Sequence, residues 1–160
     1  MSENQTPKKA SFFGLMGAML NGKAIPSPDV MKAEVESWQL PKLPESGKAL
    51  IYVVRPSVFG GMIKFRVFLD DKEASSEMGY THYQRYIYFS VAPGEHTLFT
   101  KAENWAEFPV AVKANDVIFI KQEPSLGAMK ARIKMTKIDD VEGKYLVKTL
   151  SPGTLLKTEK

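Results

Sequence analysis

Between Lys48 and Ile138, apolar and polar residues alternate with a period of two in a series of short runs. This period is typical of β-strands, whose successive side chains point to opposite faces of a sheet. Residues that break strands or favour turns, such as Pro56–Gly61 and Pro93-Gly94, separate the runs. The predicted strands cover residues 49–55, 63–70, 73–78, 82–91, 96–102, 105–113, 116–122 and 128–138. Their regular spacing predicts an antiparallel sandwich of immunoglobulin-like or transthyretin-like type.

The chain before Lys48 has a helical pattern instead. Residues 1–9 are polar and are predicted to be a disordered tail. Residues 10–46 form an amphipathic prefix with a proline-containing linker at its end, and residues 12–20 present one apolar stripe at helical spacing. A second helix is predicted to start at Ser27, because Pro28 and Asp29 follow as first-turn residues and Met31, Val35 and Trp38 form a stripe.

A short helix is also predicted after the last long strand. Asp139 and Asp140 provide a capping signal, and Pro152-Gly153 closes the segment after Leu150. The β-sandwich domain is therefore assigned to residues 47–150, and residues 151–160 are assigned to a tail.

Composition narrows the class of protein. The 160 residues are 44% hydrophobic, which suffices for one contiguous core. Because the chain has no cysteine, disulfides, thiolate metal cages, a cysteine nucleophile and a lipid-carrying cysteine are excluded. The uncharged run 10–22 is shorter than the ~20 residues of a membrane-spanning helix. It lacks a clean cleavage site, so we expect a cytoplasmic protein, with export as the alternative.

Three segments in order carry a family resemblance. They are residues 47–56, which end in Tyr-x-x-Arg-Pro, residues 65–70, which end at a turn aspartate, and residues 91–98, which contain Pro-Gly-x-His-Thr. This pattern resembles an uncharacterised bacterial family, the domain of unknown function 2846, over about residues 47–138. The Pro-Gly-x-His-Thr part is also similar to surface-exposed sandwich domains known for a Pro-Glu-Gly-Ala motif. The resemblance implies a small sandwich with no assigned activity, and many relatives look like secreted lipoproteins.

No catalytic constellation emerges, so we expect a non-enzymatic protein without cofactor or metal. If Pro93-Gly94 centres a hairpin, the two histidines, His82 and His96, lie roughly 30 Å apart and cannot share a metal. His96 is predicted to be a hydrogen-bonded core or rim residue, and His82 a strand-end surface residue. Asp70-Asp71 is interpreted as a turn, and Arg55 as a structural residue that caps carbonyls or forms an ion pair.

Two surfaces are candidates for partner binding. In the same hairpin register, the side chains that point to the outer face of one sheet are Tyr86, Tyr88, Phe99 and Lys101. Exposed aromatic patches of this kind tend to be covered by another part of the chain or by a partner. An N-terminal helix of the same chain is one candidate cover, and a partner protein or another subunit is the other. The second surface is one face of the last strand, which carries Lys130, Arg132 and Lys134. That face is either solvated or bound to an anionic partner.

The leading hypothesis is an interaction or structural module of a bacterial assembly, in which the sandwich is a scaffold and the N-terminal helices are the contact element. A protein partner or self-association follows from it. The alternative is a protein that binds an anionic ligand such as lipid or polysaccharide, or a membrane surface through Phe12 to Leu20. A net charge of +4 without aromatics between the cations disfavours nucleic acid.

Overall fold

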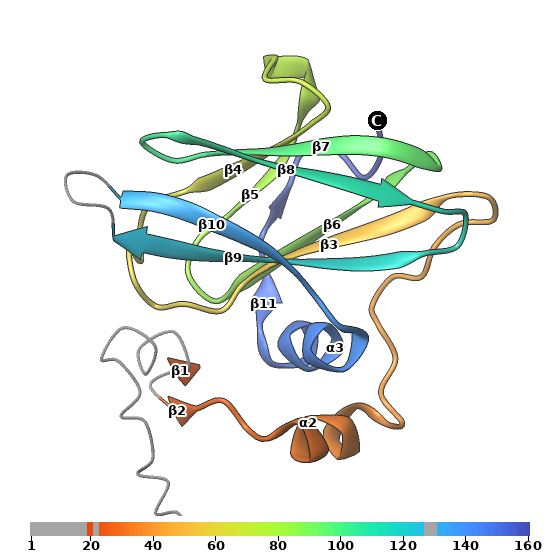
Figure 1. Cartoon of the computed structure of the whole chain (residues 1–160), viewed down its shortest axis with the longest axis vertical. Coiled ribbons are helices and arrows are strands. Elements are labelled where there is room, and N and C mark those ends of the chain that lie inside the picture. Colours follow the sequence, from red (N-terminus) through yellow and green to blue (C-terminus); the bar gives the residue numbers. More distant parts are fainter. Residues whose placement is uncertain (1–18, 21–22, 127–130) are drawn as a thin grey trace, which may run out of the picture.

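Two five-stranded sheets pack face to face in the computed structural model, which describes residues 19–20, 23–126 and 131–160 (Figure 1). The predicted mainly-β sandwich is confirmed. The first sheet has the order β10-β9-β3-β6-β11, and the second has the order β12-β5-β4-β7-β8. The strands of the first sheet are β3 (Ala49–Arg55), β6 (Arg85–Val91), β9 (Val117–Leu126), β10 (Ala131–Ile138) and β11 (Ser151–Pro152). Those of the second are β4 (Phe65–Leu69), β5 (Glu77–Thr81), β7 (Gly94–Lys101), β8 (Trp105–Val112) and β12 (Thr154–Leu155).

Strand β3 is the centre of the molecule, and all seven of its residues are buried. Ile51 and Val53 point into the core between the two sheets, whereas Tyr52 and Val54 point into a second core on the outer side of the first sheet. Strand β3 runs antiparallel to β6 but parallel to β9, so the sandwich is not wholly antiparallel as predicted.

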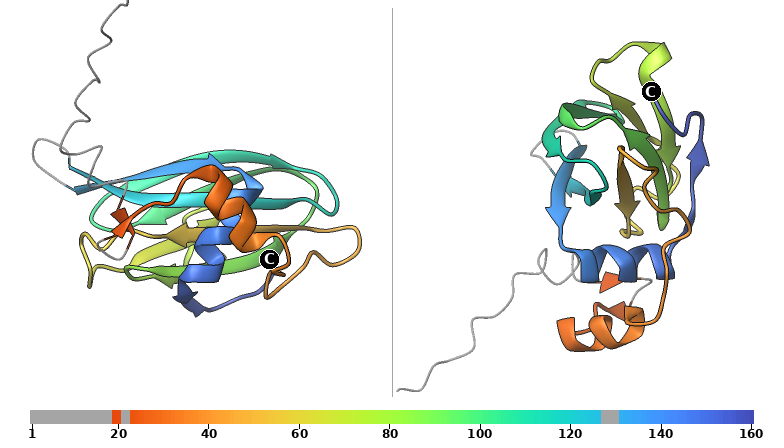
Figure 2. Two further views of the ribbon diagram at one scale, coloured as in Figure 1. Left: turned by 90° about the horizontal axis from the view of Figure 1, so that it is seen from below. Right: turned by 90° about the vertical axis from the view of Figure 1, so that its right-hand side faces the viewer.

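The second core is closed by helices and by the segment that leads into the sandwich. Helix α3 (Asp140–Thr149) lies across the outer face of the first sheet, and α2 (Pro28–Val35) packs on α3 (Figure 2). The cap residues are Ser27 for α2 and Asp139 for α3, as predicted from the sequence. Met31 and Val35 are buried, and the Lys148 ammonium lies 2.8 Å from the Glu34 carboxylate. Helix α2 is thus part of the fold.

The predicted hairpin between β6 and β7 is wrong. Strand β6 belongs to the first sheet and β7 to the second, so the chain passes from one sheet to the other at Pro93-Gly94. The predicted strand over residues 73–78 is also wrong in part, because Ala74–Ser76 form a single turn of 3-10 helix before β5 begins at Glu77.

The two ends of the chain differ from the predictions. Residues 1–18, and with them most of the predicted first helix, lie outside the described part. The last two residues of that helix, Met19–Leu20, form the short strand β1, which pairs with β2 (Lys23–Ala24). Residues 151–160 are not a free tail: β11 pairs with β6, β12 pairs with β5, and Thr158 O accepts from Ser90 N at 2.7 Å.

Candidate functional site

The guanidinium of Arg55, the last residue of β3, is buried without exposed surface. One terminal nitrogen donates to the carbonyls of Ile63 (2.6 Å) and Thr81 (3.1 Å), and the other to those of Phe59 (3.2 Å) and Gly60 (3.0 Å). No carboxylate lies within ion-pair distance of it among the described residues. The prediction that Arg55 caps carbonyls is therefore confirmed.

The surroundings of Arg55 are apolar. Its guanidinium lies 3.5 Å from the centre of the Phe65 ring, and its Nε has no hydrogen-bond partner. Burial lowers the pKa of Arg55 to about 10, which leaves the side chain charged at neutral pH. A buried cation without a counter-ion is costly unless it is hydrogen-bonded, and here four carbonyls compensate it. Because three of these carbonyls belong to residues 59–63, the same bonds hold that loop in one conformation.

The loop that Arg55 holds, residues 56–64, exposes apolar side chains. Five of the nine large hydrophobic residues that are exposed in the described chain lie on this loop or against it. They are Val58, Phe59, Met62, Ile63 and Tyr83, whose exposed fractions run from 40% for Ile63 to 82% for Met62. We call these five residues the apolar cap. Such a concentration is unusual, because surface hydrophobic residues are normally scattered singly.

Backbone geometry makes the cap a compact turn. Gly60 has a φ of +64°, a conformation that glycine adopts without strain. Ile63 N donates to Gly60 O at 2.9 Å, and Tyr83 N donates to Gly61 O at 3.4 Å. The Tyr83 ring lies beside Gly61, at van der Waals distance (3.4 Å) from where a Cβ would stand. Tyr83 thus joins the cap although it is distant in sequence.

The cap lies at the basic end of the sandwich. Strand register places Val54 of β3 opposite Lys121 of β9, and the rest of β9 and the start of β10 extend past the end of β3 toward the same end of the sandwich, at the left of Figure 1. The start of β4 is level with the end of β7. The cations at this end include Lys64, Arg66, Arg85, Lys101, Arg132 and Lys134, and the carboxylates include Glu103 and Glu123.

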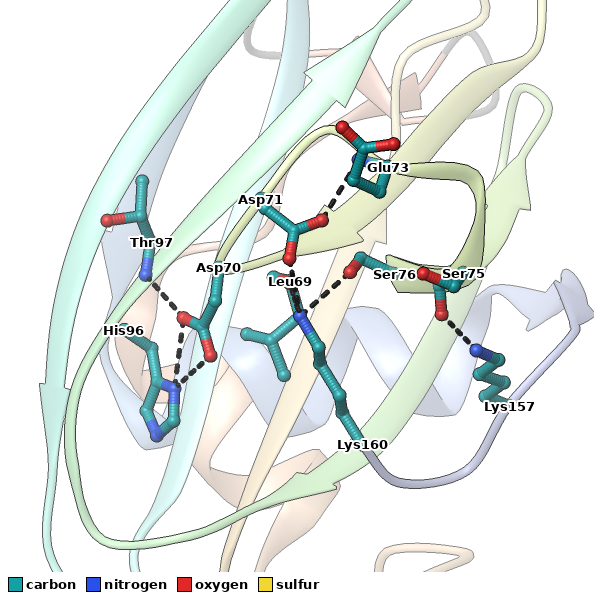
Figure 3. Close-up of polar contacts among 10 residues, drawn as sticks. All are labelled: Leu69, Asp70, Asp71, Glu73, Ser75, Ser76, His96, Thr97, Lys157 and Lys160. Carbon is teal, nitrogen blue, oxygen red and sulfur yellow. Dashed lines mark hydrogen bonds and ion pairs between the residues drawn. The ribbon is translucent and has the colours of Figure 1, made fainter.

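The opposite end is polar and is rich in carboxylates. Figure 3 shows its two main contacts, both of which start in the turn after β4. The Asp70 carboxylate accepts from Nδ1 of His96 (2.9 Å), and that of Asp71 lies 3.1 Å from the Lys160 ammonium. Hydrogen bonds from the Ser76 hydroxyl and from Glu73 N, together with Lys160, lower the pKa of Asp71 to about 2. These contacts tie the C-terminal segment to the turn.

Comparison with known proteins gives a family without a function. The model of the family described as "Protein of unknown function (DUF2846)" matches residues 45–135, more than half of the chain. The chain belongs to this family. An uncharacterised protein of Haemophilus influenzae is 23% identical to it over 144 residues, which cover 89% of this chain and 82% of that protein.

The DUF2846 region contains Arg55, the apolar cap and both histidines, but neither α2 nor α3. His96 is confirmed as a hydrogen-bonded rim residue, because its Nε2 also faces Ala92 O at 2.6 Å. Both ring nitrogens thus face oxygen acceptors, the Asp70 carboxylate and the Ala92 carbonyl. His82 was predicted to be a surface residue at the end of a strand over residues 82–91; it lies in the connection between β5 and β6 and is half-buried beside the Tyr80 ring.

Among the described residues, no three His, Cys, Asp or Glu side chains are grouped so that they could hold a metal ion. In the same part of the chain, no helix has the length and apolar character needed to cross a membrane. Asp70-Asp71 forms a turn, as predicted, and both carboxylates have structural partners.

The first predicted partner surface does not exist as one patch in the DUF2846 sandwich. Tyr86 and Tyr88 lie in the first sheet, and their rings contact Tyr52 in the second core. Residues of α3 and Leu40 cover them from within the same chain. Phe99 and Lys101 lie in the second sheet instead, where the Lys101 ammonium is 5.3 Å from the Trp105 ring.

The second predicted surface remains in part. Arg132 and Lys134 are exposed on β10, whereas Lys130 lies outside the described residues. This strand face and the loop after β3 are far apart in sequence. The structure brings them to one end of the sandwich, because β3 and β9 are parallel and β9 and β10 form a hairpin.

Proposed function

We propose that this chain is a non-enzymatic binding module that uses the apolar cap as its contact surface. The observation that carries this proposal is the exposure of four apolar side chains on a loop that a buried arginine holds in place. Exposed apolar clusters of this kind mark contact surfaces. The sandwich is the scaffold, as in the hypothesis from sequence. The proposed contact element is now the loop after β3 and not the N-terminal helices.

The rigidity of the loop supports a binding role. One guanidinium holds three carbonyls of the loop, those of Phe59, Gly60 and Ile63, and ties them to Thr81 O of β5, so little conformational entropy is lost when a partner covers the loop. Helix α2 is a weaker candidate, because its apolar residues Met31 and Val35 already pack within the chain.

A cysteine footprint of the full-length protein tests the proposal. The chain has no cysteine, so Met62→Cys creates a single thiol at the most exposed cap position. Its rate of maleimide labelling is measured for the purified protein and for the same protein expressed in its native cells and labelled in a fresh extract. A covered cap should react at least about tenfold more slowly in the extract.

Leu156→Cys is the matched control, because Leu156 is 55% exposed outside the cap. Its labelling rate in the extract should equal that of the purified protein. Equal rates for Met62→Cys in both preparations would show that nothing covers the cap, and the proposal would then be wrong. Circular dichroism confirms that both variants keep the wild-type fold.

A further inference from the structure

Several backbone groups of the cap loop are hydrogen-bonded from inside the protein. Arg55 occupies the carbonyls of Phe59, Gly60 and Ile63, and the backbone N–H of Tyr83 occupies that of Gly61. The N–H of Phe59 donates to the Ser57 hydroxyl at 3.1 Å. Moving a backbone polar group into an apolar phase is costly unless it is hydrogen-bonded. The carbonyls of Phe59, Gly60, Gly61 and Ile63 therefore already have partners before the loop leaves water, which lowers the cost of its transfer.

The side chains of the loop suit an apolar phase with a polar boundary. Met62, Val58, Phe59 and Ile63 provide the apolar surface, and Tyr83 adds an aromatic ring with a polar tip. Aromatic rings with polar tips are typical of the boundary between headgroups and acyl chains. Residues 54–67 contain no carboxylate, and neither do residues 78–94. These two segments therefore bring no negative charge next to the cap.

Charge complementarity indicates which apolar phase this is. Lys64 directly follows the cap, and Arg132 and Lys134 are exposed on β10 at the same end. Most carboxylates of the turns lie at the other end of the strands, namely Asp70, Asp71, Glu73, Glu95 and Asp116. An anionic surface therefore attracts the cap end and repels these turns, which orients the molecule before contact.

We propose that the cap end docks on the surface of a lipid bilayer that contains anionic lipids, with Met62 and its apolar neighbours at the boundary between headgroups and acyl chains. Lys64, Arg132 and Lys134 lie against the headgroups. This inference rests on the proposed function and names its partner. It places the membrane contact on the loop after β3 and not on residues 12–20, for which the sequence alone predicted such a contact.

Cosedimentation of the full-length protein with vesicles tests the inference. The vesicles are pure phosphatidylcholine, or phosphatidylcholine with a quarter of phosphatidylglycerol. The protein should sediment with the anionic vesicles at low salt, and the bound fraction should fall as salt screens the cations. Met62→Asp should lower the partition coefficient about tenfold, because an apolar side chain is replaced by one that must be dehydrated. Lys64→Gln should lower it about fivefold.

Leu43→Asp is the control for Met62→Asp, because Leu43 is 59% exposed in the segment between α2 and β3. This variant should bind vesicles within about twofold of the wild type. A second readout uses Met62→Cys labelled with a polarity-sensitive fluorophore. Its emission should shift to the blue when anionic vesicles are added, whereas the same label at Leu43→Cys should not respond.

Wild-type protein that stays in solution with anionic vesicles would overturn the inference, and so would a Met62→Asp variant that binds them as well as the wild type. The cysteine footprint separates this failure from failure of the proposed function. If an extract cleared of membranes still protects Met62→Cys while vesicles do not bind, the cap has a protein partner and only the lipid inference fails. If neither extract nor vesicles protect the cap, both fail.

Discussion

Replacement of Arg55 by methionine should destabilise the protein and release the cap loop. Methionine keeps an unbranched apolar stem in the buried position but removes the guanidinium and its four hydrogen bonds. Hydrogen bonds to a charged group contribute about 1.5–3 kcal/mol each, so four of them contribute at least about 6 kcal/mol. The buried charge opposes this gain.

Burial lowers the pKa of Arg55 from 12.5 to about 10, which gives the order of magnitude of that opposing effect. At 1.36 kcal/mol per pKa unit, dehydration of the guanidinium costs about 3 kcal/mol. The expected decrease in the free energy of unfolding is therefore about 3 kcal/mol. With an m-value typical of small proteins, the urea midpoint should fall by about 1–2 M.

The assay is urea denaturation at neutral pH, with hydrogen exchange of the native protein as the local readout. Amides of Phe59, Ile63 and Tyr83 should lose more protection in the variant than the fall in global stability accounts for, whereas those of β3 should lose only as much as global stability does. Arg85→Met is the control, because the guanidinium of Arg85 donates only to the carbonyl of the preceding residue. A midpoint for Arg55→Met within about 0.5 M of that control would refute the reasoning.

Three further predictions concern other parts of the fold. Tyr52→Phe removes the hydroxyl that donates to Lys42 O and accepts from Lys42 N, and should cost about 1–2 kcal/mol in urea denaturation at pH 8. Burial raises the pKa of Tyr52, so the unfolded chain ionises first, and the wild type should lose stability above about pH 10 more steeply than this variant. Asp71→Asn should lower the thermal midpoint at neutral pH. The pKa of Asp71 is lowered from 3.8 to about 2, chiefly by Ser76, so the stability that its carboxylate contributes to the wild type is lost as pH falls through that window. Equal dependence of the two thermal midpoints on acid pH would contradict this. Gly143→Ala places a methyl group 2.1 Å from an aromatic ring of β9 and should cost about 1–3 kcal/mol, so an unchanged thermal midpoint would exclude the packing argument.

Local signals in the sequence predicted local structure well. Strand β3 has the predicted bounds, and Ser27 and Asp139 start their helices as predicted. The turn at Pro93-Gly94 shows what local signals do not predict. They indicate that the chain changes direction there, but the pairing partner of the next strand depends on contacts far away in sequence. The predicted aromatic patch failed for this reason.

The candidate site was predictable only in part. The sequence indicated a structural role for Arg55, and the structure confirms it. The loop after it was interpreted as a plain turn because of Pro56 and Gly60-Gly61. Two apolar pairs on either side of these glycines, Val58-Phe59 and Met62-Ile63, were the available signal. The contribution of Tyr83 could not be predicted, because it depends on the passage of the chain from β5 to β6.

The short strands β11 and β12 have a consequence for solubility. Without them, β6 would be an outer strand of its sheet and β5 an outer strand of the other. Each would then present unpaired N–H and C=O groups, which recruit strands from other molecules and start aggregation. Residues 151–160, which have little periodicity, therefore cover one edge of each sheet. A chain shortened to Leu150 would keep nearly all of its apolar core and still be expected to precipitate.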